Sequence, residues 1–224
     1  MTIVIDNFPH AQYSAKTQSG FLCLYYPHDA VREGKLDPEE WRNRTYSPNI
    51  LNFKEGRDTD LEYFVPLFLK LIEHVMNLEK VEMAHLIPLP SSIAYNDPKY
   101  SRKPRVKTEK NSRNRDDRNS VFCNLLSAKD SRLRTLDILI RKTGKKEKVT
   151  WTAEQHEKSF GIHFQPESKS ISSGNLFILV DDVATHGGTL EGAAKVLQKQ
   201  FAGAKIVALS LAQSKEPGDF HPLG

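Results

Sequence analysis

Cysteine is scarce in this sequence, and its scarcity excludes a disulfide-rich domain and a domain stabilised by zinc bound to paired cysteines. Only Cys23 and Cys123 occur among 224 residues, so there is no disulfide framework and no paired thiol spacing for structural zinc. None of the eight histidines stands four residues from another, the spacing of helical metalloprotease sites. We therefore expect no metal centre built from protein ligands alone.

Long hydrophobic runs are also missing. No apolar stretch approaches the roughly 18 residues that span a bilayer, and residues 1–8 carry no basic leader. Hydrophobic residues make up 38% and charged residues 27% of the chain, which is enough for a core and a solvated surface. These features favour a cytoplasmic protein with one α/β domain, or one domain with a small elaboration, and no membrane partner.

The positive charge is concentrated in one segment. The chain carries a formal net charge of +4, and residues 97–118 alone hold nine basic and four acidic side chains. This segment has too few apolar residues to bury and is interpreted as a mobile loop. A solvated loop, a lid over a site and a nucleic-acid contact are the three interpretations left open.

Apolar spacing predicts the elements of the first two thirds of the chain. A helix is indicated from Leu61 onward, with Pro66 either in its first turn or at a bend. A further helix is expected after Asp116 or Asp117, which would cap it, and the polar stretch 152–160 is interpreted as a surface loop. Strands are predicted at 2–5, 21–26, 84–89 and 136–140, and a short helix is predicted from Pro38.

The last third reads as a strand–helix–strand unit. Strands are predicted at 176–180 and 205–211, and a helix at 189–200 that ends before Gly203. Such units build parallel sheets, so the expected fold class is α/β, with a central, mostly parallel sheet flanked by helices.

The segment 177–190, FILVDDVATHGGTL, carries the chemistry. An apolar strand delivers Asp181 and Asp182 at its carboxyl end, the edge where open parallel sheets bind ligands. Gly187 and Gly188 then open a helix, whose N–H groups and partial positive charge suit a phosphate. Carboxylates repel phosphate but accept hydrogen bonds from sugar hydroxyls, so a ribose 5-phosphate meets both needs.

This segment resembles the phosphoribosyl-pyrophosphate (PRPP) motif of type I phosphoribosyltransferases, in which four apolar residues, two acids and a Thr/Gly-rich loop follow in this order. Within that superfamily the order of IPLPSS, RNSVFCNLL and the motif is most similar to the ComF-like branch, without that branch's N-terminal zinc-binding cysteines. The resemblance covers roughly residues 80–213. Residues 1–75 would be a divergent N-terminal hood, and residues 76–224 the transferase-like core.

The resemblance implies a role for each matched residue. Asp181 and Asp182 would hold the ribose hydroxyls, and the first serines after the strand at 84–89, Ser91 and Ser92, would lie at the pyrophosphate. Arg105 and Arg118 are candidates for neutralising that group. The 5′-phosphate loop would consist of Thr185, His186, Gly187, Gly188 and Thr189. His186 replaces a threonine common in the family, and Thr185 replaces an aspartate of hypoxanthine-type relatives.

The implied activity is displacement of pyrophosphate from PRPP by a nitrogenous base, with Mg²⁺ chelated by the substrate rather than by the protein. Two alternatives stay open. One is a non-catalytic PRPP-binding regulator, connected with DNA uptake, repair or phage defence. The other is a nucleic-acid-binding module that uses the basic loop. A protein partner and a homodimer are further open expectations.

Overall fold

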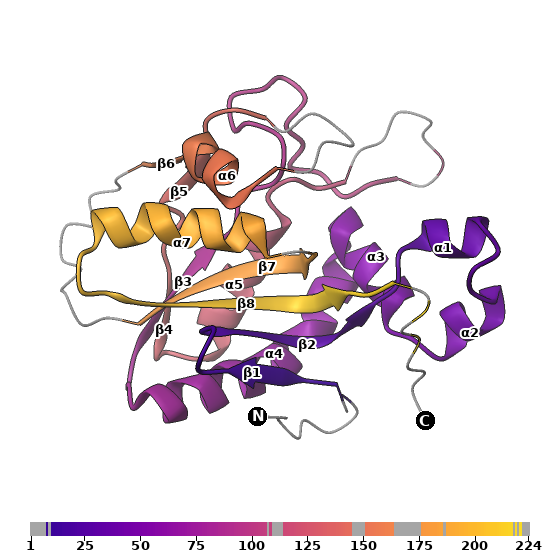
Figure 1. The fold of residues 1–224 in the computed structure, drawn as a ribbon, viewed down its shortest axis with the longest axis horizontal. Helices are drawn as coiled ribbons and strands as arrows, with labels where there is room; N and C mark the ends of the chain where they lie inside the picture. The colour runs from indigo at the N-terminus through magenta and orange to yellow at the C-terminus, as the bar shows by residue number, and fades with distance from the viewer. Residues whose placement is uncertain are drawn as a thin grey trace.

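A six-stranded mixed sheet organises the chain (Figure 1). The computed structural model describes residues 8, 10–106, 108, 114–144, 151–163, 176–185, 187–216, 218 and 220. The strands lie in the order β1-β2-β8-β7-β3-β4, and only the β1–β2 pair is antiparallel. The strand bounds are β1 Gln12–Ser14, β2 Ser19–Tyr25, β3 Ala84–Pro88, β4 Leu133–Thr135, β7 Leu176–Ala184 and β8 Lys205–Ser214.

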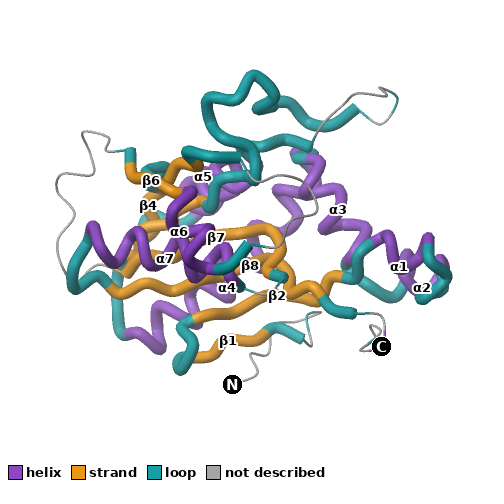
Figure 2. Tube along the Cα trace, turned by 45° about the horizontal axis from the view of Figure 1, so that its top comes forward, coloured by secondary structure: helices purple, strands orange, loops and turns teal. Residues whose placement is uncertain are grey.

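Helices cover both faces of this sheet (Figure 2). One face packs against α3 (Ser47–Glu55), α4 (Asp58–Glu79) and α5 (Arg118–Lys129). The other face packs against α7 (Gly188–Gln200) and the small antiparallel pair of β5 (Leu139–Arg141) and β6 (Phe160–Ile162). The remaining helices are α1 (His28–Arg32), α2 (Pro38–Asn43) and α6 (Ala153–Ser159).

The first 75 residues share the core of the rest of the chain. Strand β2 hydrogen-bonds to β8, and buried side chains of β2 and α4 belong to the same cluster as those of β3 and β7. Position 75 itself lies inside α4. Helices α1 and α2 instead enclose a separate small cluster around Trp41. Whether residues 1–75 act as a hood stays a prediction.

Most elements match the sequence expectations, and three differ for identifiable reasons. Pro66 lies inside α4 rather than in its first turn, since the helix begins at Asp58. The expected strand 136–140 is replaced by β4 and β5, because the chain leaves the main sheet and pairs with β6. The expected loop 152–160 is mostly α6, whose capping box joins Thr152 and Gln155. The strand expected at 2–5 lies outside the described residues.

No helix among the described residues is long and apolar enough to cross a membrane. Cytoplasmic location stays a prediction.

Helices α6 and α7 approach closely at Gly192. A Cβ atom there would lie 2.7 Å from His156 Cβ and 2.8 Å from Ala153 O. Gly188, at the start of α7, has more room, because its Cβ would lie 3.6 Å from the nearest atom, Trp151 O.

We predict that Gly192→Ala lowers the free energy of unfolding by about 1–2 kcal/mol, because the two helices must separate, and overpacking outweighs the gain in helix propensity. Gly188→Ala is the matched control and should leave stability nearly unchanged. Urea unfolding measures both variants. Equal stabilities would contradict the close helix contact.

Candidate functional site

Two adjacent carboxylates stand near the carboxyl end of β7, between two parallel neighbours. Pro88 of β3 is in register with Val180, and the Leu89 N–H donates to Val180 O at 2.8 Å. On the other side, Asp181 is in register with Ser210 of β8. The structure therefore places Asp181 and Asp182 near the sheet edge that the sequence predicted, but within β7, because this strand continues to Ala184 rather than ending at Val180.

Asp182 forms a buried ion pair with Arg118, the first residue of α5. Arg118 Nε donates to Asp182 Oδ2 at 2.7 Å, and Nη2 lies 2.6 Å from the same oxygen. The side chains are 13% and 7% exposed, so little water screens the pair. Burial alone would raise the pKa of Asp182, but Arg118, with Lys54 contributing, holds that pKa well below its usual range.

The pKa of Asp181 is shifted in the opposite direction to that of Asp182. Burial, and next the negative charge of Asp182, raise the pKa of Asp181 well above its usual value. Its Oδ1 accepts the Asp182 N–H at 2.8 Å and lies 3.4 Å from Asn119 Nδ2. That amide also donates to Leu89 O at 2.9 Å and so joins the ends of β3 and β7. Adjacent carboxylates with opposed pKa shifts are typical of functional sites.

A second arginine, Arg141, lies beneath the loop that follows β3. Its Nε donates to Ser91 O at 2.6 Å, and its guanidinium lies 4.3 Å from the centre of the Phe160 ring. Burial lowers the pKa of Arg141 to about 10, although the charge of Asp181 opposes the shift. The guanidinium remains charged at neutral pH and adds positive potential beside Asp181.

Lys54 of α3 brings a further cation to the site from the N-terminal segment. Its Nζ lies 5.5 Å from the centre of the Tyr25 ring, and its charge contributes to the lowered pKa of Asp182. Burial, and next the charge of Asp182, raise the pKa of Tyr25 to about 12. The sequence analysis missed Lys54, Asn119 and Arg141, because tertiary packing alone brings them to the acid pair.

The residues expected to form the phosphate loop follow directly after β7. Thr185 O accepts from Gln213 Nε2 at 2.8 Å, and Gly187, the N-cap residue of α7, has a φ of 73°, which favours glycine. Gly188 is the first residue of α7, and Thr189 Oγ1 lies 3.3 Å from His156 Nε2. His186 lies outside the described residues.

The other candidates for the pyrophosphate site are arranged differently from one another. Ser91 is buried and its Oγ accepts the Ile93 N–H at 3.2 Å, whereas Ser92 is exposed. The Arg105 N–H donates to Glu55 O at 2.9 Å, and its guanidinium lies 3.8 Å from Glu55 Oε1. The contacts of Arg105 are therefore with α3, whereas Arg118 contacts the acid pair.

The basic loop is attached to the rest of the molecule at several points within its described part. Ser101 and Asp116 bridge its two ends, through Ser101 N–H to Asp116 Oδ2 at 2.8 Å and Asp116 N–H to Ser101 O at 2.7 Å. Arg102 donates to the Tyr95 hydroxyl at 2.8 Å. Among the described residues, no group of three or more His, Cys, Asp or Glu side chains could hold a metal ion.

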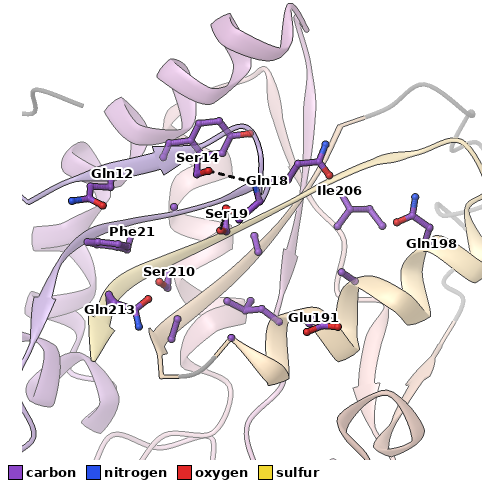
Figure 3. Close-up of a pocket in the computed structure, with 18 residues that line it drawn as sticks. Gln12, Ser14, Gln18, Ser19, Phe21, Glu191, Gln198, Ile206, Ser210 and Gln213 are labelled. Atoms are coloured by element: carbon purple, nitrogen blue, oxygen red, sulfur yellow. Dashed lines mark hydrogen bonds between the residues drawn. The ribbon is translucent and has the colours of Figure 1, made fainter. Parts of the chain in front are cut away.

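A cavity with a volume of about 770 Å³ adjoins the phosphate-loop segment (Figure 3). Its lining includes Ala184 and Gly187 but neither Asp181 nor Asp182.

Comparison with models of known protein families finds no match, and comparison with curated proteins finds none either. The family resemblance thus stays a prediction.

We predict that Asp182→Asn lowers the free energy of unfolding by about 3 kcal/mol, because it leaves the Arg118 guanidinium buried without its carboxylate. Combining Asp182→Asn with Arg118→Met should restore most of that loss. Urea unfolding of the two variants tests this. A loss below about 0.5 kcal/mol for Asp182→Asn, within the usual range for a surface change, would contradict the buried pair.

We predict that Asp181→Asn stabilises the protein at alkaline pH. The folded-state pKa of Asp181 is raised, so the native protein loses stability as pH rises from the unfolded-state value of about 3.9 through the folded value. Asparagine keeps the Oδ1 acceptor and has no such loss. The melting temperature of the Asp181→Asn variant should therefore exceed that of the wild type by a margin that grows from pH 5 to pH 9.

The matched control is Asp29→Asn, whose carboxylate is 77% exposed. A constant difference between Asp181→Asn and wild type across this pH range would show that Asp181 is not held in a charge-disfavouring environment.

Proposed function

We propose that this protein binds PRPP with its chelated Mg²⁺ and transfers the phosphoribosyl group to a nitrogenous base, within a type I phosphoribosyltransferase fold. The observation that carries this proposal is the position of Asp181 and Asp182 near the end of a central parallel strand, with Gly187, the N-cap of α7, five residues after Asp182. That arrangement offers sugar-hydroxyl acceptors and phosphate donors side by side.

The contacts of the acid pair suggest separate roles for its two members. Asp182 is engaged by Arg118, so its role would be to hold the guanidinium toward the departing pyrophosphate. Asp181 would accept the ribose hydroxyls. This assignment differs from the expectation that both carboxylates hold the sugar. The physical reason is that a buried guanidinium keeps its carboxylate partner.

Three cations surround the acid pair: Lys54, Arg118 and Arg141. Together they outnumber the two carboxylates, which favours an anionic ligand at this edge. In the proposed reaction a ring nitrogen of the base forms a bond to the anomeric carbon as the bond to pyrophosphate breaks, and the nitrogen's proton passes to solvent. The cations and the Mg²⁺ bound to the substrate stabilise the negative charge that develops on pyrophosphate.

A second candidate is PRPP binding without turnover. The ion pair between Arg118 and Asp182 favours it, because one acid of the motif is already occupied by a protein side chain.

Calorimetry with PRPP and Mg²⁺ tests the shared part of both candidates. The wild type should bind, and Asp181→Asn should bind at least about tenfold more weakly, because an amide oxygen cannot become the charged acceptor that Asp181 would offer the ribose hydroxyls once the ligand favours its ionised form. The exposed Asp29→Asn control should bind as the wild type does. Absence of binding to the wild type would overturn the proposal. Pyrophosphate release over a panel of bases then separates the transferase from the binding protein.

A further inference from the structure

A groove lies where the sheet lacks a covering helix. Strands β1 and β2 join through the short turn 15–18, so their connection adds no helix to the face on which α7 packs. The space beside α7, over β8, β2 and β1, remains open and has a volume of about 770 Å³ (Figure 3). This size lies within the range of small-molecule sites.

The lining of the groove mixes apolar and uncharged polar side chains. Among the described residues that line it there is no Lys or Arg, and the one acid, Glu191, lies 2.8 Å from Lys195 Nζ. Amide side chains come from three different elements and the β1–β2 turn: Gln12, Gln18, Gln198 and Gln213. Such a lining offers no neutralising charge to a phosphate or a carboxylate. It offers paired donors and acceptors to an uncharged ligand.

Ser210 supplies an independent indication of a ligand. Its side chain is only 1% exposed, yet its Oγ has no hydrogen-bond partner among the residues that the structure describes. Ser210 lines the groove, where Figure 3 shows it on β8. A buried hydroxyl without a partner is unfavourable, and each such group in a native structure calls for an explanation. A ligand in the groove that forms a hydrogen bond with the Ser210 hydroxyl would provide such an explanation.

The strand register connects the groove to the acid pair. Asp181 of β7 is paired with Ser210, Ser210 with Phe21 of β2, and Phe21 with Gln12 of β1. Residues in register on neighbouring strands share a face of the sheet and lie about 5 Å apart. These four paired residues therefore form a row across the sheet, which runs from the Asp181 carboxylate through the Ser210 hydroxyl and the Phe21 ring to the Gln12 amide.

We propose that this groove binds an uncharged planar nitrogen heterocycle, with its edge against the glutamine amides and the Ser210 hydroxyl and its face on Phe21. Glutamine amides pair in bidentate fashion with the donor and acceptor edges of such rings, and aromatic rings stack on their faces. In its further role the heterocycle is the acceptor of the phosphoribosyl group, and this role rests on the proposed function. Binding in the groove does not depend on it.

The test uses adenine and uracil as probes, titrated at millimolar concentration into the full-length protein. At least one of them should bind. Ser210→Ala should weaken that binding about fivefold, the loss of one neutral hydrogen bond, without lowering the melting temperature. Ala208→Phe places a ring inside the groove and should abolish binding. Ala128→Phe, at an exposed position of α5, is the matched control and should bind normally.

The possible outcomes separate this inference from the proposed function. If neither probe binds, or if both groove variants bind as the wild type does, the groove assignment is overturned. PRPP affinity is measured on the same variants and should be retained in Ser210→Ala. If PRPP does not bind the wild type while a probe binds in the groove, the groove assignment stands and the transferase function fails.

Discussion

Two neighbouring carboxylates buried near the end of a strand require a cation. This requirement determines how the helix that supplies the cation packs against the centre of the sheet. Arg118 meets it by beginning α5 beside Asp182, which places α5 against the ends of β3 and β7. Asn119, the next residue, then spans Leu89 and Asp181. Arg118, which contacts Asp182, is also the last residue of the basic segment 97–118.

The ion pair between Arg118 and Asp182 also gives the two carboxylates different protonation behaviour. A carboxylate that is strongly attached to a guanidinium stays ionised, and its charge discourages ionisation of its neighbour. The result is one permanently negative group and one group whose charge depends on its surroundings. If the ligand carries Mg²⁺, as proposed, it would favour the ionised form of Asp181, and its binding would then release a proton at this edge.

The sequence predicts the last third of the fold well, because β7, α7 and β8 each have a clear apolar period and a turn residue at their ends. The same segment predicts where Asp181 and Asp182 lie. The sequence does not reveal β6, a strand of only three residues, or the role of His156 in packing α6 on α7. These depend on contacts between segments that no local pattern encodes. For the same reason the sequence does not assign Lys54 and Arg141 to the site. It also does not predict that Arg105 contacts Glu55 instead of the acid pair.

The first and last strands of the parallel region are joined directly, since Ser19 pairs with Ala208 across almost the whole chain. β8 fills the space between β2 and β7, so a nascent chain that lacks it presents two unsatisfied strand edges at once. Such pairing between segments distant in sequence raises the contact order and slows folding. Until β8 pairs with β2 and β7, those two strand edges can pair with other chains, so we expect aggregation to compete with folding.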